Sequence, residues 1–171
     1  MKDFVKDVCV VGIAAVIVLQ FVQPTRVFGI SMQPTFHQND YLIVSKEAYA
    51  KTQPKRGDVV VFQSKLLSAS GQEELLIKRI IGLPGDTVLI EDGNVYINGD
   101  MIADSYTKDK YTNGYMSVKV PKGSYFCMGD NRLHSTDSRF ESVGCVNKDQ
   151  IKGKVVFRVF PFTKMGRIGS H

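Results

Sequence analysis

The chain has 171 residues, of which 43% are hydrophobic and 23% are charged. These values predict one globular domain with a core of its own and a small sub-domain, and they exclude an intrinsically disordered chain. The net charge is +5, but the 22 lysines and arginines are scattered along the sequence. A nucleic-acid-binding face is therefore not expected, and a surface beside an anionic membrane explains the basic balance better.

Residues 8–22 form the first apolar segment and read VCVVGIAAVIVLQFV, without a charge. A core helix would show a polar stripe at helical spacing, and none is visible. A cleaved signal peptide would place small residues before the cut, and residues 23–28 offer none. An uncleaved transmembrane anchor is therefore favoured, although the run is slightly shorter than the roughly 17–25 residues that usually span a bilayer.

This anchor divides the predicted chain into three parts. Residues 1–7 form a short cytoplasmic N-terminus, residues 8–23 form the transmembrane helix, and residues 24–171 form an extracytoplasmic domain. The orientation rests on a weak excess of lysine before the segment over arginine after it.

After residue 28 the sequence changes to short runs of β-branched and aromatic residues separated by turn residues. This pattern predicts a mainly β protein with antiparallel sheets and no further long helix. The expected strands are residues 41–45, 58–62, 75–81, 87–90, 95–97, 117–120, 124–128 and 154–160. Asp92–Asn94 predicts a tight hairpin, residues 64–74 predict a loop, and the strand-poor stretch 99–114 indicates an inserted sub-domain at about 92–122.

The three cysteines, Cys9, Cys127 and Cys145, lack the spacing of a zinc site. No metal and no cofactor is therefore expected. Cys127 lies in a predicted strand and is expected to be a small buried apolar residue. A disulfide between Cys127 and Cys145 remains open, because its formation depends on geometry.

Three islands of polar residues carry the candidate chemistry. The first, Gly29–Thr35, reads GISMQPT and places Ser31 just after the anchor and ahead of a proline. A serine hydroxyl is a poor nucleophile until a base removes its proton. Taken alone, this heptapeptide is better explained by a serine in a turn.

The second island, Ile77–Asp86, reads IKRIIGLPGD, and Lys78 and Arg79 interrupt its branched aliphatic residues. Neighbouring side chains of a strand point to opposite faces, so one of the two is expected to face inward. A buried lysine without a carboxylate partner has a lowered pKa, and a neutral lysine is a competent general base. Taken alone, a Lys–Arg pair on the surface of an edge strand explains the motif better.

The third island, residues 129–139, reads GDNRLHSTDSR and follows a hydrophobic strand. Asp137 and Arg139 are suited to an ion pair, and Ser135 is suited to a hydrogen bond with a base. A solvated loop is the simpler explanation, but the density of short polar and charged residues makes it less convincing. His134 lies close to Asp137 and offers an alternative Ser–His–Asp triad.

The order of the three islands after an N-terminal anchor resembles that of the bacterial type I signal peptidases, the leader peptidase family of Ser/Lys serine proteases. SMQPT is similar to the nucleophile box of the family, KRIIGLPGD to its lysine box, and GDNRLHSTDSR to its C-terminal box. Residues 56–62 resemble a further strand of the family. The resemblance spans essentially the whole chain, and the two longer motifs are specific.

The resemblance implies a role for each matching residue. Ser31 is expected to attack the scissile carbonyl, and Lys78 is expected to be its general base. Ser135 is expected to orient the lysine amine by a hydrogen bond, while Asp137 and Arg139 support the site as an ion pair.

Other residues of the motifs are expected to complete the site. Asp130, Asn131 and Arg132 shape the turns around it, and the backbone N–H of Ser31 stabilises the oxyanion. Some family members add a serine hydroxyl two residues before the nucleophile. This sequence has Gly29 at that position, so the additional donor is missing.

The family cleaves signal peptides from secretory preproteins after small residues at the first and third positions before the cut. The implied substrate binds as an added strand, with Ile30, Met32, Leu76 and Ile77 as walls of shallow apolar pockets. The implied protein is a single-pass enzyme that contacts the lipid bilayer of the bacterial plasma membrane, with its catalytic domain outside the cytoplasm. The sequence leaves the oligomeric state open, and a monomer is favoured.

Three alternatives compete with this hypothesis. One is another Ser/Lys processing peptidase, of the conjugation-associated or organellar inner-membrane type. A self-cleaving repressor would need an N-terminal DNA-binding domain instead of the anchor. An inactive membrane-tethered β domain that binds secretory chains would not need both Ser31 and Lys78, and the lysine box favours Lys78 over His134 as the base.

Overall fold

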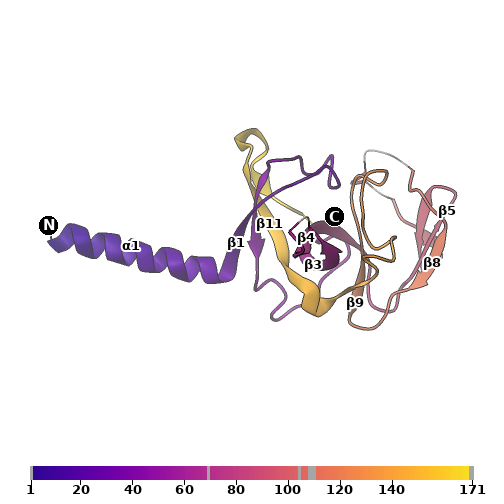
Figure 1. Cartoon of the computed structure of the whole chain (residues 1–171), viewed down its shortest axis with the longest axis horizontal. Coiled ribbons are helices and arrows are strands. Elements are labelled where there is room, and N and C mark those ends of the chain that lie inside the picture. Colours follow the sequence, from indigo (N-terminus) through magenta and orange to yellow (C-terminus); the bar gives the residue numbers. More distant parts are fainter. Residues whose placement is uncertain (1, 69, 104, 108–110, 170–171) are drawn as a thin grey trace.

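A computed structural model of the chain describes residues 2–68, 70–103, 105–107 and 111–169. Helix α1, Lys2–Phe21, projects away from a body made of two sheets (Figure 1). All pairings within both sheets are antiparallel. The predicted fold class, a mainly β protein with antiparallel sheets, is confirmed.

The larger sheet has the strand order β1-β2-β11-β3-β4-β9-β10, and β12 pairs with β11 outside this path. Its strands are β1 Val22–Arg26, β2 Tyr41–Ser45, β3 Val59–Leu67, β4 Glu73–Gly82, β9 Ser124–Met128, β10 Val146–Asn147, β11 Ile151–Phe160 and β12 Gly166–Arg167. Two short 3-10 helices, η1 Lys148–Gln150 and η2 Phe162–Lys164, lie on either side of β11 in the sequence. Strands β3 and β4 lie near the middle of the order, so the second polar island lies inside the sheet.

The smaller sheet has the order β7-β6-β5-β8. Its strands are β5 Thr87–Glu91, β6 Asn94–Ile97, β7 Asp100–Met101 and β8 Met116–Lys119. Asp92 and Gly93 join β5 to β6 with positive φ values of 48° and 80°, which is the geometry of the tight hairpin turn that matches strand twist. The hairpin predicted from these turn residues is therefore confirmed.

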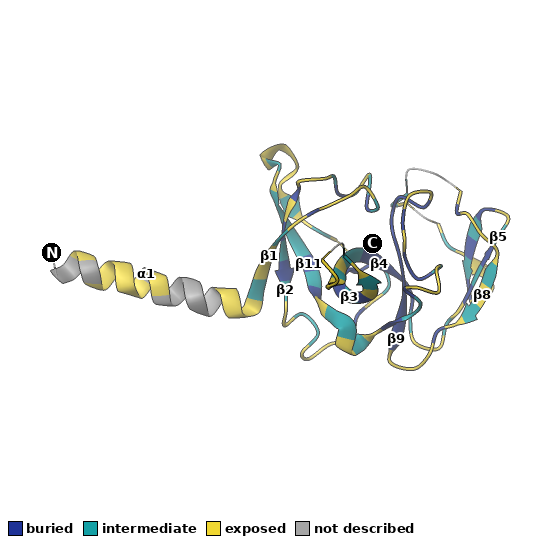
Figure 2. Ribbon diagram, in the orientation of Figure 1, coloured by how far each residue is buried: buried dark blue, intermediate teal, exposed yellow. Residues whose placement is uncertain are grey.

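Buried apolar side chains join the two sheets and hold the first polar island in place. Figure 2 colours β9, which belongs to this core, as buried. One core cluster combines Val88 and Ile90 of the smaller sheet with Phe126 and Met128 of β9. Another cluster packs residues around the first island with strands β2, β3 and β11. The third covers the opposite side of β3, β4 and β9 and contains Cys127.

Two segments differ from the expectations. Residues 64–74, predicted as a loop, largely continue strands β3 and β4, which pair as far out as Leu67 and Glu73. Beyond Ser64, none of the described residues of this hairpin extension is buried, and Leu66 packs only partly against the core. Its sequence therefore lacks the alternation that a buried face imposes. Residues 22–26 form edge strand β1 directly after the helix, and Pro24 is tolerated there because an edge strand leaves one side unpaired.

Helix α1 therefore ends at Phe21, two residues before the predicted end of the anchor at residue 23. Among the described residues, no helix reaches the combination of length and hydropathy that identifies a membrane span. The three cysteines are unbonded. Cys127 is fully buried, and burial raises the pKa of its thiol, which fits the prediction of a small apolar residue.

Candidate active site

The first island forms a turn that is fastened to the third island. The Asn131 backbone N–H donates to the Ser31 carbonyl at 3.0 Å, and the Asn131 side-chain amide donates to the Ile30 carbonyl at 3.1 Å. Met32 and Phe36 are 2% and 0% exposed and attach the same turn to the core. The turn that carries Ser31 is thus held from both sides.

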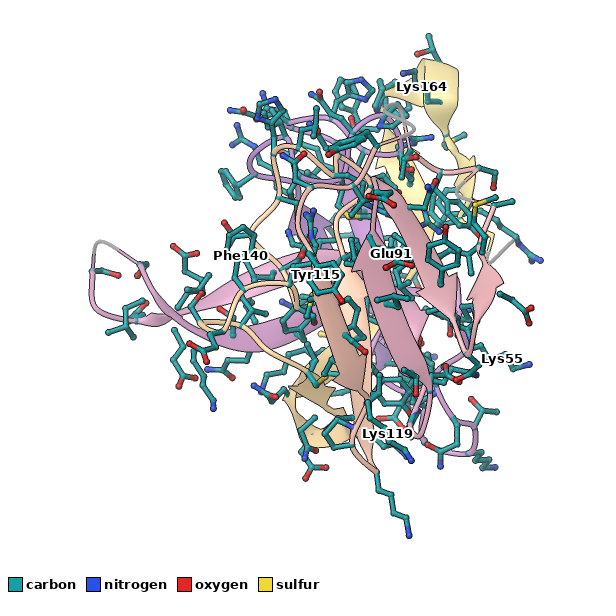
Figure 3. All side chains as sticks on the ribbon, turned by 90° about the vertical axis from the view of Figure 1, so that its right-hand side faces the viewer. Lys55, Glu91, Tyr115, Lys119, Phe140 and Lys164 are labelled. Atoms are coloured by element: carbon teal, nitrogen blue, oxygen red, sulfur yellow. The ribbon has the colours of Figure 1, made fainter. Side chains whose placement is uncertain are left out.

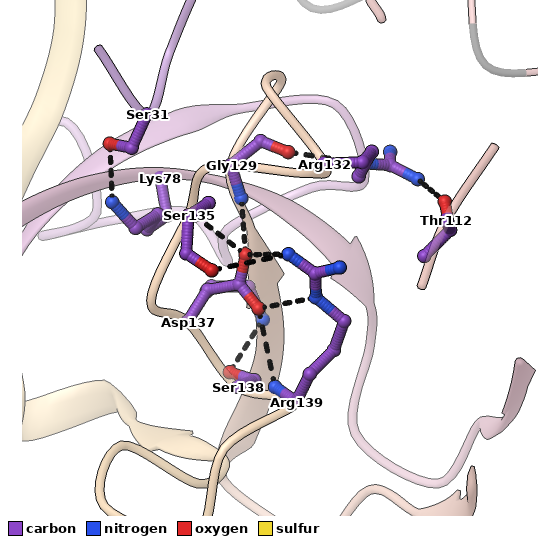
Figure 4. Close-up of polar contacts among 10 residues, drawn as sticks. Ser31, Lys78, Thr112, Gly129, Arg132, Ser135, Asp137, Ser138 and Arg139 are labelled. Atoms are coloured by element: carbon purple, nitrogen blue, oxygen red, sulfur yellow. Dashed lines mark hydrogen bonds and ion pairs between the residues drawn. The ribbon is translucent and has the colours of Figure 1, made fainter. Parts of the chain in front are cut away.

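Lys78 reaches Ser31 from strand β4. Its Nζ donates a hydrogen bond to Ser31 Oγ at 2.7 Å (Figure 4). The Lys78 side chain is buried, with 3% of the residue exposed. This burial lowers the pKa of Lys78 to about 8, while the more distant charge of Asp137 opposes the shift. In the neutral state the same contact lets Nζ accept the Ser31 proton, which is what a general base requires.

The third island is organised around the fully buried carboxylate of Asp137. Arg139 donates from Nε to Oδ1 at 2.8 Å and from Nη2 to Oδ2 at 2.9 Å, so the predicted ion pair forms. The Gly129 backbone N–H also donates to Oδ2 at 2.9 Å. Because every one of these donors compensates the carboxylate charge, Asp137 is a fixed support rather than a free acid.

Ser135 takes a different partner from the one that the resemblance implies. Its hydroxyl donates to Asp137 Oδ2 at 2.7 Å, and no hydrogen bond between Ser135 and Lys78 is present among the described side chains. A Cβ on Gly129 would lie 2.5 Å from both Ser135 Cβ and the Ser31 carbonyl oxygen. Only glycine at position 129 therefore allows the third island to pack this closely against the nucleophile turn.

A second buried ion pair lies beside the dyad and was not predicted. Arg79 donates from Nε and Nη2 to the two carboxylate oxygens of Asp130 at 2.9 and 2.7 Å. Thr35, in the nucleophile turn, donates its hydroxyl to Asp130 Oδ2 at 2.5 Å, and the Arg79 guanidinium lies 3.8 Å from the ring centre of Tyr106. The sequence offered one signal for this pair. Because side chains alternate along a strand, Arg79 must lie on the face of β4 opposite Lys78.

The structure offers a candidate hydrogen-bond donor for the oxyanion hole, the backbone N–H of Ser31. Among the described residues, the Ser31 backbone N–H makes no hydrogen bond, so it is available to an incoming oxyanion. Gly29 has a φ of +82°, and a Cβ there would meet no atom within 4 Å. The position is open in space, but its backbone conformation favours glycine.

The remaining predicted residues lie at the rim of the dyad or beneath it. Ile30 is 44% exposed, whereas Met32 is buried in the core, so only Ile30 presents an open apolar surface. Leu76 and Ile77 are partly buried on β4. His134 is exposed, and it is Lys78 that contacts Ser31, so the alternative triad does not form.

No group of His, Cys, Asp and Glu in the described part of the chain has the proximity that a metal ion requires.

Residues 1–160 match the model of the family described as signal peptidase, peptidase S26. The chain belongs to this family. The resemblance inferred from the three islands is therefore confirmed.

Similar proteins agree with this assignment. Signal peptidase I of Bacillus licheniformis is 36% identical over 176 residues, which cover 95% of this chain and 90% of that protein. Signal peptidase I T of Bacillus subtilis (strain 168) is 37% identical over 171 residues, which cover 94% of this chain and 86% of that protein. The probable signal peptidase I-2 of Synechocystis sp. is 41% identical over 137 residues, and this chain covers 62% of its length.

A crystal structure of a signal peptidase I from Enterococcus faecalis V583 has a TM-score of 0.50 and 30% sequence identity, covering 61% of this chain and 97% of that one. The family consists of serine endopeptidases that cleave signal peptides from secreted precursors and are membrane-anchored in bacteria. The enzyme class and the function predicted from the sequence are confirmed at this level.

Proposed function

We propose that the chain cleaves signal peptides with Ser31 as nucleophile and Lys78 as general base. The observation that carries this assignment is the 2.7 Å contact between Lys78 Nζ and Ser31 Oγ. Burial lowers the pKa of Lys78 to about 8, which brings a useful fraction of neutral amine into the physiological range.

In the proposed reaction, Lys78 takes the Ser31 proton as Oγ attacks the scissile carbonyl. The Ser31 N–H stabilises the oxyanion, and Lys78 then passes the proton to the leaving amine. An ester acyl-enzyme remains on Ser31 until Lys78 activates a water molecule that hydrolyses it. Ser135, Asp137 and Arg139 hold the third island against this pair, and Ser135 acts on the lysine environment through Asp137.

We propose the first half of β4 as the place where the precursor binds. On one side this half pairs with β3, while β9 joins the other side only from Arg79 onward. Within the described residues, no strand pairs with the second edge of residues 75–77. An extended precursor can add there as a strand that ends at Lys78 and Ser31. Ile30, Leu76 and Ile77 then line the bound precursor and favour small side chains before the cut, with Met32 beneath them. Leu76 and Ile77 do so from opposite faces of β4, because neighbouring side chains of a strand alternate.

We further propose that residues 8–23 anchor the enzyme in the lipid bilayer as a single pass, with residues 24–171 outside the cytoplasm of a bacterium. The absence of charge from residues 8–22 supports this arrangement. Residues 92–122, which contain much of the smaller sheet, are proposed as an inserted sub-domain. The enzyme is proposed to act as a monomer.

The dyad is tested by cleavage of a precursor with alanine at the first and third positions before the cut, using the full chain in detergent. Ser31→Ala and Lys78→Ala are each expected to reduce kcat/KM by at least about 10³-fold, because nucleophile and base act as one unit. Mass spectrometry of the products identifies the cut.

His134→Ala is the matched control, because His134 is exposed and lies in the same island as the supporting residues. It is expected to keep nearly full activity. Loss of cleavage in His134→Ala together with activity in Lys78→Ala would show that the base has been assigned to the wrong residue.

A further inference from the structure

A cleft of about 310 Å³ adjoins the dyad without containing it. One wall comes from residues 113–116, which lead into β8 of the smaller sheet, and the other from residues 132–140 of the third island. None of the residues to which a role before the cut is assigned lies in this lining. The cleft is therefore separate from the shallow pockets proposed for small side chains.

The cleft begins next to the nucleophile. Ser135 is part of its lining, and Ser135 Cβ and the Ser31 carbonyl oxygen both lie 2.5 Å from the point where a Cβ of Gly129 would stand. Figure 4 shows Ser135 beside Lys78, with Arg139 farther from Ser31. A peptide bound at Ser31 thus reaches the cleft after a short distance.

The direction of the bound precursor assigns the cleft to the residues after the cut. The proposed binding edge, residues 75–77, lies before Lys78 in strand β4 and would hold the residues before the cut. Beyond Arg79 this edge is occupied by β9, so the precursor must leave β4 at the dyad. Ser135, which lines the cleft, lies beside Lys78 at the point where the precursor leaves β4.

The lining of the cleft suits a large apolar side chain. Tyr115 and Phe140 are 79% and 50% exposed, and Figure 3 shows them on the same face of the molecule. Leu133, which is 41% exposed, adds to the apolar rim. The cleft reaches the lower end of the roughly 300–1,000 Å³ typical of ligand pockets, which is far more space than an alanine methyl group fills.

The arginines of the lining do not make the cleft a site for an acidic side chain. Arg139 is engaged with both oxygens of Asp137 and with the Ser135 carbonyl. Arg132 donates to the Gly129 carbonyl at 3.0 Å and to the Thr112 hydroxyl at 3.0 Å. Because Arg132 is 2% exposed and Asp137 compensates the charge of Arg139, a precursor carboxylate gains little from these cations, and exposed aromatic rings dominate the rim.

We infer that this cleft is a subsite for an aromatic or large aliphatic side chain of the precursor, within the first three residues after the cut. The inference rests on the proposed function, because the position of the cleft relative to the precursor depends on Ser31 being the nucleophile. It adds a second specificity to the enzyme, on the side of the mature protein.

The test uses the full chain in detergent and a set of peptides that share one sequence before the cut, with alanine at the first and third positions. After the cut they carry alanine at all three positions, or a single phenylalanine, leucine or aspartate at one of them. The wild type is expected to favour phenylalanine or leucine over alanine at one position by about tenfold in kcat/KM, the scale on which apolar pockets discriminate. Aspartate at the same position is expected to give no gain.

Tyr115→Ala and Phe140→Ala are each expected to reduce this preference to less than about threefold, chiefly through a higher KM for the preferred peptide. Phe162→Ala is the matched control, because Phe162 is 73% exposed and lies outside the cleft, and it should keep the wild-type ratio. Thermal unfolding verifies that each variant is folded.

The outcomes separate the two claims. Equal cleavage of all peptides by the wild type, or an unchanged preference in both variants, overturns the subsite while leaving the dyad intact. Cleavage of none of the peptides overturns the proposed function and the subsite with it.

Discussion

Strand β4 carries two adjacent basic residues, Lys78 and Arg79, on opposite faces, and their surroundings differ in charge. Lys78 and Arg79 are 3% and 2% exposed, so both are buried. Arg79 forms a bidentate ion pair with Asp130, whereas Lys78 hydrogen-bonds to the neutral Ser31 hydroxyl. The Asp130 carboxylate offsets the free-energy cost of burying the Arg79 charge. Among the described residues, no carboxylate contacts Lys78 directly, so the cost of burying its charge lowers its pKa instead. One strand therefore holds a structural cation and a reactive amine one residue apart.

The largest effect is expected where the paired face is broken. Asp130→Asn removes the charge that compensates buried Arg79, and it is expected to lower the free energy of unfolding by about 3–5 kcal/mol. Urea denaturation measures the change. Glu141→Gln is the control, since Glu141 is an exposed carboxylate in the neighbouring loop and should stay within about 0.5 kcal/mol of the wild type. A loss below about 1 kcal/mol for Asp130→Asn would remove the contrast between the two faces.

The second test concerns the unpaired face. Lys78→Met removes a charge whose pKa is lowered by burial from 10.5 to about 8, so at pH 7 the variant is expected to be about 3 kcal/mol more stable, at roughly 1.4 kcal/mol per pKa unit. Between pH 8 and 10.5 the unfolded wild type binds more protons at Lys78 than the folded wild type. Wild-type stability therefore rises with pH across this window, and the advantage of the variant disappears.

Urea denaturation at several pH values measures this difference. Lys119→Met, at an exposed position of strand β8, is the matched control and should show no such pH dependence relative to the wild type. A Lys78→Met variant that is less stable than the wild type at pH 7 would indicate that the lysine charge is stabilised in the fold.

The third and smallest effect appears in the rate. The dyad requires neutral Lys78, so kcat/KM is expected to rise about tenfold per pH unit at low pH and to level off above the lowered pKa of about 8. A peptide without titrating side chains keeps the substrate constant over this range. A profile that levels near pH 6.5 would instead indicate a histidine base.

Strands and turns were predictable where side-chain chemistry alone determines them. β2 begins and ends at the predicted residues, Tyr41 and Ser45, because a short run of branched apolar residues bounded by turn residues is typical of a strand. The outer hairpin of β3 and β4 was missed because its pairing depends on backbone hydrogen bonds rather than on a buried face. β1 was missed because its first two residues, Val22 and Gln23, belong to the predicted anchor. The proline that follows them, Pro24, fits a strand only because β1 lies at the edge of the sheet.

The site was predictable in its members more than in its contacts. Ser31 and Lys78 are 47 residues apart, and each is ordinary without the other. The family resemblance supplied the pairing that local pattern does not contain. The partner of Ser135 and the pairing of Arg79 with Asp130 depend on how three distant segments pack, for which the sequence carries no local signal.

The junction between α1 and β1 has a consequence for where the enzyme can cut. The helix ends at Phe21 and the strand begins at Val22, with no linker between them. Lys46, directly after β2, holds the end of the helix in place. Its backbone N–H donates to the Phe21 carbonyl at 2.9 Å, and its Nζ donates to the Leu19 carbonyl at 3.1 Å. If this helix is the proposed anchor, the catalytic domain has no slack and Ser31 stays at one height above the bilayer. A precursor is then selected by the distance of its cleavage site from the bilayer surface as well as by its sequence.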